Sequence, residues 1–284
     1  MLCNCDDPFE SNFFKYFVLN FNKLGLKKLI ATCYAGSPVA KTFPFGAYKA
    51  IVTKVYDIGG DGAINMEDIK QLFEAGENTL VPLEGDGDFR SEECVELLRE
   101  ADIVCTNPPF SLFREYVAQL IEFGKDFLIV GNKNAITYKE IFPLIKDNEL
   151  WIGTRNINTD FWLKVPEGRE YEKVVNGEKL KHIMACWFTN LDIKKRHEEL
   201  PLAKRYNPEH YPKYDNYDAI NVDKVALIPY DYDGVMGVPI TFLGQYCPEQ
   251  FEIVGNEYSL EIEKGRGYVK GKRMYSRIFI RRKV

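Results

Sequence analysis

Residues 101–124, ADIVCTNPPFSLFREYVAQLIEFG, contain the transition that decides the fold. The apolar run at 102–106 predicts a buried strand, and the apolar periodicity over 112–123 predicts an amphipathic helix that ends at Gly124. Between them, two consecutive prolines in residues 107–110 are incompatible with both helix and strand pairing. The stretch therefore predicts a rigid turn at the carboxyl end of a strand, where open α/β sheets bind their ligands.

The same alternation of strands and helices extends outward from this stretch. Strands are expected at residues 1–5, 28–33, 50–56, 102–106 and 126–130, and helices at 12–24, 92–100, 112–123 and 138–146. Strands separated by helices are typical of a parallel sheet with helices on both faces, so the predicted fold class is α/β. From residue 151 onward the segments are shorter and richer in Tyr, Pro, Gly and Asn, although an apolar strand at 182–189 can still belong to the sheet.

Length and composition limit the class of protein. With 284 residues the chain has room for about two domains, and 45% apolar with 28% charged residues is typical of a globular protein. No apolar run reaches the roughly 20 residues of a membrane span, and the start of the chain lacks a secretory signal. The seven cysteines are scattered, several of them in strand-like runs, which indicates reduced intracellular thiols rather than a disulfide framework.

Charge is distributed unevenly along the chain. The net charge of −5 argues against a protein that is basic over its whole surface, so binding to nucleic acid requires a local patch. Residues 57–100 carry thirteen acids and three bases, whereas residues 264–284 carry nine bases and no acid. The bases of this tail alternate with apolar residues, so one face can pack while the other contacts DNA phosphates. Those predicted to bind DNA are Lys272, Arg273, Arg277, Arg281 and Arg282. The alternative is a solvated edge strand whose charges only prevent pairing with other chains.

The turn at 107–110 has the groups that amino-group methylation needs. The side-chain oxygen of Asn107 and the backbone carbonyl of Pro108 can accept both hydrogens of a purine amino group, while Pro109 keeps the turn rigid. Phe110 can stack on an extruded base. Positioning and electrostatics carry most of such a reaction, so no charged base is required. The alternative is a surface turn that happens to contain two prolines.

Seven blocks of the chain resemble the EcoRI-type adenine-specific DNA methyltransferases. They are CNCDDPFESNFFKYF (3–17), LGLKKLIATCY (24–34), GDGDFRS (85–91), ADIVCTNPPFSLFREYVAQLI (101–121), FLIVGNKNAITYKEIFPLIK (127–146), YPKYDNYDAINV (211–222) and GVMGVPITFL (234–243). The resemblance implies a Rossmann-like fold that uses S-adenosylmethionine, with residues 107–110 as its catalytic motif. Standard methyltransferases have a glycine-rich loop after the first strand, whereas residues 6–12 contain no glycine; the family shares this difference. The chain also differs from family members at its start, because it begins almost at the first block, before which members carry a further segment that helps to hold the cofactor.

The resemblance also implies cofactor contacts at two places. Asp6 and Asp7 follow the first strand, where a carboxylate can accept from the methionine ammonium or a ribose hydroxyl. The alternative is a pair of acids favoured by the dipole of the next helix. Asp88 and Phe89 precede the helix before the catalytic strand, where related methyltransferases place an acid and an aromatic residue against the adenine of the cofactor. The alternative there is a glycine-rich turn with a helix cap.

Residues 57–68, DIGGDGAINMED, resemble a calcium-binding loop. Its ligand positions would be filled by Asp57, Asp61, Asn65 and Asp68. A glycine stands at the third position and Asp replaces the bidentate Glu at the twelfth, so a vestigial or weak site is favoured over an occupied one. Neither the histidines nor the cysteines have the spacing of a zinc site.

The sequence thus predicts a methyltransferase that transfers a methyl group from S-adenosylmethionine to the exocyclic amino group of adenine in duplex DNA. Residues 1–190 would form the catalytic domain and residues 191–284 the target-recognition region. Two alternatives remain open: a methyltransferase for another planar amide or amine in RNA or protein, and a catalytically silent DNA-binding relative. We expect a bacterial or phage-encoded cytoplasmic protein with no membrane partner, compatible with a monomer. A cognate restriction endonuclease would belong to the same system without direct contact.

Overall fold

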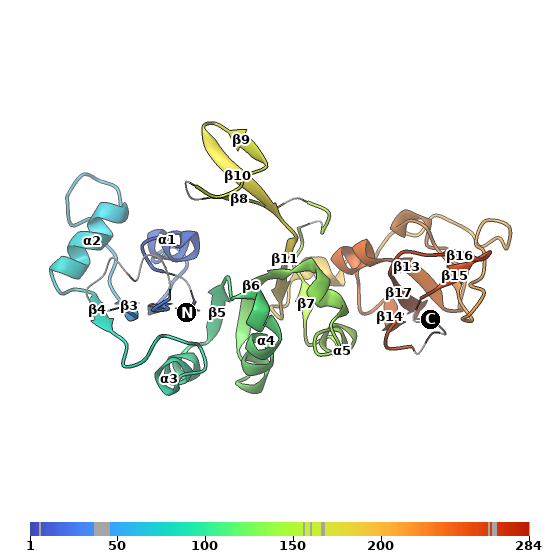
Figure 1. Ribbon diagram of the computed structural model, residues 1–284, viewed down its shortest axis with the longest axis horizontal. Helices are drawn as coiled ribbons and strands as arrows, with labels where there is room; N and C mark the ends of the chain where they lie inside the picture. Colours follow the sequence, from blue (N-terminus) through green and yellow to red (C-terminus); the bar gives the residue numbers. More distant parts are fainter. Residues whose placement is uncertain are drawn as a thin grey trace. The chain divides into compact units, whose positions relative to one another are not determined.

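A computed structural model describes residues 1–5, 7–36, 46–155, 157–159, 161–165, 168–260, 262 and 266–283. The chain forms two compact units, Met1–Gly131 and Asn132–Val284 (Figure 1). This structural boundary lies earlier than the functional division near residue 190 that the sequence predicts. That division stays a prediction about the roles of the two parts.

The first unit is built on a mixed sheet with the strand order β4-β3-β2-β1-β5-β6. The strands are β1 (Leu2–Cys3), β2 (Leu29–Cys33), β3 (Tyr48–Val52), β4 (Thr79–Pro82), β5 (Ile103–Thr106) and β6 (Asp126–Asn132). As predicted, β1 is parallel to β2 and β5, and β5 is parallel to β6. The expectation of a wholly parallel sheet is wrong at one edge, because β3 is antiparallel to both β2 and β4. Alternating burial along β3 and exposed residues in β4 are typical of antiparallel strands, which tolerate one solvated face.

Helices cover both faces of this sheet, as the sequence predicts. They are α1 (Asn12–Leu19), α2 (Met66–Glu74), α3 (Glu92–Glu100) and α4 (Phe113–Glu122). α1 and α2 lie on one face, with α3 and α4 on the other (Figure 1). The first pair packs Phe14, Val18, Ile69 and Leu72 against the buried side chains of β1, β2 and β3. The hydroxyl of Ser91 caps α3 at its predicted start, whereas α1 ends at Leu19, five residues earlier than predicted.

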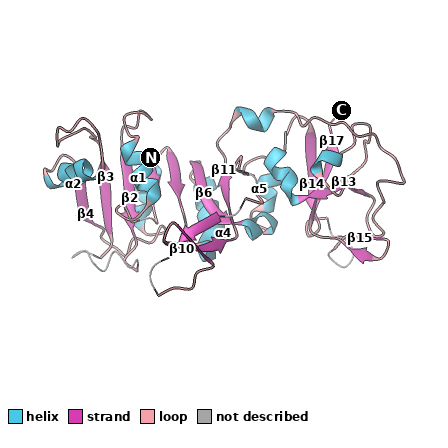
Figure 2. Ribbon diagram, turned by 90° about the horizontal axis from the view of Figure 1, so that it is seen from above, coloured by secondary structure: helices cyan, strands magenta, loops and turns pink. Residues whose placement is uncertain are grey.

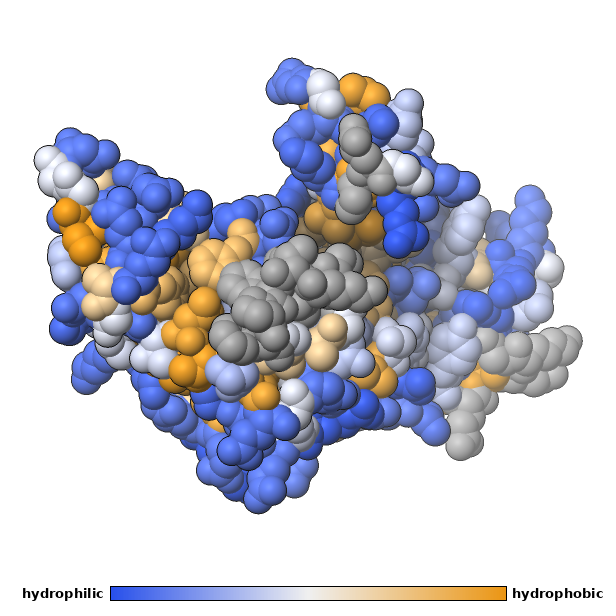
Figure 3. Space-filling model, turned by 60° about the vertical axis from the view of Figure 1, so that its left-hand side comes forward, coloured by the Kyte–Doolittle hydropathy of each residue, from blue (hydrophilic) through white to orange (hydrophobic). Residues whose placement is uncertain are grey.

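Apolar side chains also reach the surface of the first unit. Figure 3, in which the left-hand part of Figure 1 comes forward, shows apolar patches among mainly hydrophilic side chains. Tyr16, Leu24 and Tyr34 are among the exposed large hydrophobic residues of this unit. Single exposed residues of this kind are normal, so only those beside the predicted site bear on function.

The second unit contains several smaller sheets (Figure 2). Its elements are α5 (Phe142–Lys146), β7 (Trp151–Ile152), β8 (Phe161–Lys164), β9 (Lys173–Val175), β10 (Glu178–Ile183), β11 (Ala185–Thr189), β12 (Ile220–Asn221), β13 (Met236–Pro239), β14 (Phe251–Asn256), β15 (Tyr268–Val269), β16 (Lys272–Arg273) and β17 (Arg277–Arg282). The strand expected at 182–189 is divided between β10, which pairs with β8 and β9, and β11, which pairs with β7. A further sheet has the order β12-β13-β17-β14, so β17 is a central strand and not an edge. No helix in the described ranges has the length and apolarity to cross a bilayer.

Candidate active site at the carboxyl edge of the sheet

The predicted strand, turn and helix follow one another in the structure. β5 ends at Thr106, and the extended backbone of Pro109 (φ −61°, ψ 123°) leads into a 3-10 turn over Phe110–Leu112. The amide of Leu112 donates to the carbonyl of Pro109 over 3.0 Å, which closes this turn before α4 begins. Residues 107–110 therefore lie at the carboxyl end of a strand in the middle of the sheet.

The groups that the sequence singles out in this turn are available to a ligand. The side chain of Asn107 is exposed, Pro108 is buried, and Phe110 is half-buried. Among the described residues, no hydrogen bond occupies the amide of Asn107 or the carbonyl of Pro108, and no other aromatic ring contacts Phe110. Two acceptors and one ring face of the same turn are thus left without a protein partner from the described chain.

A buried polar network holds this turn against the end of β1. The hydroxyl of Thr106 donates to the backbone carbonyl of Asn4, and the hydroxyl of Tyr116 in α4 donates to the side-chain oxygen of Asn4. All three residues are almost fully buried. Directly after Asn4, Cys5 adopts a left-handed backbone conformation (φ 64°) that turns the chain out of the strand. This network was not predicted, because Asn4 is more than 100 residues from both of its partners in the chain.

The loop after β1 carries one of the predicted cofactor carboxylates. Asp7 accepts hydrogen bonds from the amides of Phe9 (2.9 Å) and Glu10 (3.1 Å) and from the hydroxyl of Tyr48 (2.7 Å). Burial, and then the Asp7 carboxylate, raise the pKa of Tyr48 well above its usual range, so the phenol remains a donor. Asp7 is therefore fixed in place by its own turn and by β3. Asp6, its predicted companion, lies outside the described residues.

The second predicted cofactor segment lies at the same edge of the sheet. The carbonyl of Asp86 accepts from the amide of Ala35, just beyond β2, over 2.7 Å. Gly87 has φ +77°, and a Cβ there would lie 2.7 Å from the carbonyl oxygen of Cys33. Only glycine lets the loop approach β2 this closely.

Within this segment, Asp88 and Phe89 have different surroundings. Arg90 donates to both carboxylate oxygens of Asp88 (2.9 and 2.8 Å), and these bonds lower the pKa of Asp88. Arg90 also donates to Glu115 in α4 over 2.9 Å. Phe89 is buried and packs edge-on against Tyr116, with 5.0 Å between ring centroids and an interplanar angle of 77°. The exposed aromatic side chain nearby is Tyr34, which follows β2 and was not selected from the sequence.

The side chains predicted as calcium ligands accept hydrogen bonds from backbone amides. The carboxylate of Asp57 accepts from the amide of Gly62 over 2.7 Å, and Asp61 accepts from Ala63 over 2.9 Å. Asn65 and Asp68 form the capping box that starts α2, in which backbone amides lower the pKa of Asp68. No group of three or more His, Cys, Asp or Glu within the described chain is arranged to hold a metal ion.

The predicted DNA-binding residues of the second unit fall into two groups. Lys272, Arg273 and Arg281 are exposed and Arg282 is half-buried, and Arg281 lies 3.8 Å from Glu252 in a loose ion pair. Arg277 is only 9% exposed, and its Nε donates to the side-chain oxygen of Asn221 over 3.3 Å. Its guanidinium therefore forms a hydrogen bond inside the second unit and is not a surface charge.

Burial and strand pairing contradict both interpretations of β17, the alternating apolar and basic faces and the solvated edge strand. Residues 277–280 are all buried, so the expected alternation of apolar and basic faces is absent from the first part of β17. The solvated-edge alternative is also wrong for this strand, because β13 and β14 flank it on both sides. Only its last residues, Arg281 and Arg282, reach the surface.

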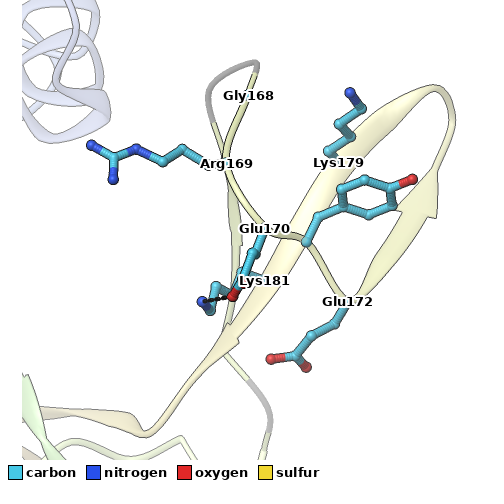
Figure 4. A pocket seen from close by; sticks show the side chains of 7 residues that line it. Gly168, Arg169, Glu170, Glu172, Lys179 and Lys181 are labelled. Carbon is cyan, nitrogen blue, oxygen red and sulfur yellow. Dashed lines mark ion pairs between the residues drawn. The ribbon is translucent and has the colours of Figure 1, made fainter.

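A separate open cavity lies on the β8-β10-β9 sheet of the second unit and does not include any predicted site residue. It has a volume of about 600 Å³ and is lined by residues 168–172 together with Lys179 and Lys181. Figure 4 shows acidic and basic side chains mixed around it, with Lys181 and Glu170 3.9 Å apart. Because acidic and basic side chains are mixed in this lining, it favours neither anionic nor cationic ligands.

Comparisons with known proteins show similarity over the whole chain. The family model described as adenine-specific methyltransferase EcoRI matches residues 1–283. The chain is 46% identical over 289 residues to the Type II methyltransferase M.EcoRI of Escherichia coli, covering 99% of this chain and 85% of that protein. It is 38% identical over 307 residues to the Type II methyltransferase M.MpnI of Mycoplasma pneumoniae, covering 100% of this chain and 87% of that protein. No solved structure matches the chain significantly.

Proposed function

The chain belongs to the EcoRI family of adenine-specific methyltransferases, and we propose that it transfers a methyl group from S-adenosylmethionine to the exocyclic amino group of adenine in duplex DNA. The relatives are named Type II methyltransferases, so the role would be to mark or protect sites in DNA. The observation that carries the proposal is the turn at 107–110, in which the exposed side chain of Asn107 and the carbonyl of buried Pro108 have no partner among the described residues.

The proposed chemistry follows from this turn. The side-chain oxygen of Asn107 and the carbonyl of Pro108 accept the two hydrogens of the adenine amino group. These bonds increase the electron density on nitrogen and aim its lone pair, while Phe110 stacks on the extruded base. Because the acceptors are fixed before the base arrives, little reorganisation is needed at the moment of transfer.

The carboxyl edge of the sheet fits the cofactor that the family implies. When bound, S-adenosylmethionine supplies the methyl group. Asp88, kept ionised by Arg90, can accept from a ribose hydroxyl or an ammonium group. Asp7 holds a second carboxylate at the same edge. Gly87 leaves the loop without a side chain where it meets β2, and exposed Tyr34 offers an aromatic face beside it.

Duplex DNA would meet the basic surface at the end of the second unit. The exposed members of the predicted set are Lys272 and Arg273 on β16, together with Arg281 at the end of β17. Glu252 lies 3.8 Å from Arg281, so a phosphate can replace this partner at low cost. Arg277 is left out of this contact because it is buried.

A labelled methyl group tests the proposal against its alternatives. The protein would be incubated with S-adenosylmethionine labelled in its methyl group and, in separate reactions, with genomic DNA lacking adenine methylation, total RNA and unfolded protein. We expect label in DNA alone. Label in RNA or protein would favour the wider amino-group methyltransferases, and cofactor-independent DNA binding without transfer would favour the silent relative.

A further inference from the structure

We propose that Asn4 is a positioning residue for methyl transfer, holding the catalytic turn and the cofactor-binding loops in register. The inference rests on the proposed function. Asn4 does not touch the predicted substrate groups. It lies 2% exposed at the end of β1, where its backbone carbonyl accepts from Thr106 and its side-chain oxygen accepts from Tyr116.

The first link runs from Asn4 to the catalytic turn. Thr106 directly precedes Asn107, and its hydroxyl donates to the carbonyl of Asn4 in the interior. Branching at Cβ restricts the χ1 angle of Thr106, so the hydrogen bond that holds its hydroxyl also restrains its backbone. The position of Asn107 therefore depends on the backbone of residue 4.

The second link runs through Tyr116 to the Asp88 loop. The side-chain oxygen of Asn4 accepts from the hydroxyl of Tyr116, and the ring of Tyr116 packs edge-on against Phe89. Phe89 adjoins Asp88, whose partner Arg90 reaches back to Glu115 in the same helix as Tyr116. One asparagine side chain thus connects α4 and the Asp88 loop with the end of β1.

The third link is the chain itself. After Asn4 the left-handed Cys5 (φ 64°) turns the backbone out of β1, and Asp7 further along accepts from Tyr48 in β3, which β2 separates from β1. A shift at Asn4 therefore moves a cofactor carboxylate on one side and the acceptor turn on the other. A misplacement of about 1 Å between reacting groups can reduce a rate by about a hundredfold.

The second unit supplies a matched control for the test. Tyr214 is 5% exposed, and its hydroxyl donates to the side-chain oxygen of Asn221 over 3.0 Å. Tyr116→Phe and Tyr214→Phe each remove one buried hydroxyl from a tyrosine–asparagine pair, and only the first pair adjoins the predicted site. We expect Tyr116→Phe to melt at a lower temperature than the wild type, because it removes the hydroxyl that donates to the buried side-chain oxygen of Asn4. Tyr214→Phe should lose less stability, because the side-chain oxygen of Asn221 still accepts from Arg277.

The decisive readout is the single-turnover rate of DNA methylation with saturating cofactor and DNA, at a temperature at which all variants are folded. We expect Tyr116→Phe to slow transfer at least about tenfold with little change in KM for DNA, since the loss is one of alignment. Tyr214→Phe should keep the wild-type rate. Thr106→Val, which keeps shape without the hydroxyl, should also slow transfer, and Thr106→Ser, which restores a donor, should recover most of the rate.

Each result decides the proposal. A lowered melting temperature with wild-type transfer rates in Tyr116→Phe and Thr106→Val would make the network merely structural and overturn the positioning role. If Tyr116→Phe fails to fold, the Val and Ser variants of Thr106 decide alone. A wild-type protein that methylates no DNA would remove the reaction itself, and the positioning role with it, so the two failures are distinguishable.

Discussion

Both units bury a tyrosine hydroxyl against an asparagine side-chain oxygen, and the two pairs have different surroundings. In the first unit, Tyr116 and Asn4 lie between a strand end and a turn, beside acceptors that the described protein leaves free. In the second unit, Asn221 also accepts from Arg277, and burial raises the pKa of Tyr214 to about 12. The same buried pair therefore lies beside the proposed catalytic turn in one unit and in a packed interior in the other. The two tyrosine–asparagine pairs differ in the segments to which they are hydrogen-bonded or packed.

The two units also differ in where their charged side chains point. Several carboxylates of the first unit accept backbone or arginine donors within their own loops, as Asp57 and Asp88 do. In the second unit several bases face solvent with loose partners, Arg281 among them. The proposed division places cofactor and chemistry in one unit and phosphate contact in the other, and each of the following changes tests it.

The largest effect is expected at Asn107. Asn107→Ala removes the positioned acceptor of the first unit and should lower the methylation rate by about 10²–10³-fold, as the loss of one preorganised interaction does in other enzymes. The side chain is exposed, so thermal unfolding should be unchanged. Stopped reactions at saturating DNA measure the rate. A variant with near wild-type turnover would remove Asn107 from the chemistry.

Phe110→Ala should have the next largest effect. Stacking of an extruded base is worth about 1–3 kcal/mol, so affinity for DNA containing a pre-extruded or mismatched target adenine should fall by about 5- to 150-fold. Cofactor binding, measured by calorimetry, should stay unchanged. If instead cofactor affinity collapses and DNA affinity does not, Phe110 belongs to the cofactor pocket.

The basic tail of the second unit is tested by salt. Reversing Arg281 and Arg282 to Glu removes two phosphate contacts and should lower the slope of log K against log salt by about 1.8, at about 0.9 for each contact. The matched control reverses exposed Lys23 and Lys27 of the first unit and should leave the slope unchanged. Titrations at several salt concentrations check both. An identical slope in all three proteins would remove the tail from the DNA surface.

A smaller effect is expected on the pH dependence of thermal stability, through His197 in the second unit. Hydrogen bonds to Asp192 and then Glu249 raise the pKa of His197. The stabilisation is therefore fully present below the ordinary histidine pKa and is lost as pH rises through the raised value. Thermal melts of the wild type should show stability falling over that window, and His197→Gln should remove that part of the pH dependence. An unchanged profile in the variant would show that this bridge does not contribute.

The smallest effect is expected from calcium. The side chains of the 57–68 loop already accept backbone amides and cap α2, so a chelator should change neither methylation rate nor melting temperature. Rates with chelator, and with calcium added back, measure this. Strong inhibition that calcium reverses would make the loop an operating metal site.

The features predicted best from the sequence are those determined by neighbouring residues in the chain, such as turns and helix starts. The proline pair at 108–109 set the turn after β5, and Ser91 set the start of α3. The resemblance to the family is confirmed over residues 1–283. The antiparallel direction of β3 was not predicted, because local periodicity does not encode which way a strand pairs. The strand β4 and the helix α2 were not among the predicted elements.

The missed features depend on contacts between distant residues. Asn4 meets Tyr116 across 112 positions, and Asp7 meets Tyr48 across 41, so no spacing rule reaches them. Arg277 looked like an exposed base because its two neighbouring strands come from other parts of the chain. Asp68 looked like a metal ligand because a capping box uses the same residue types. A carboxylate at the right spacing can satisfy either a cation or a backbone amide.

The central claim is that the turn at 107–110 directs a methyl group to the amino nitrogen of adenine. Unmethylated DNA would be incubated with the protein and S-adenosylmethionine, digested to nucleosides and analysed by mass spectrometry. The account predicts N6-methyldeoxyadenosine as the methylated nucleoside, formed at least about a hundredfold more slowly when Asn107→Ala replaces the wild type. Methylated cytosine in place of adenine, or N6-methyldeoxyadenosine at an undiminished level with the variant, would contradict it.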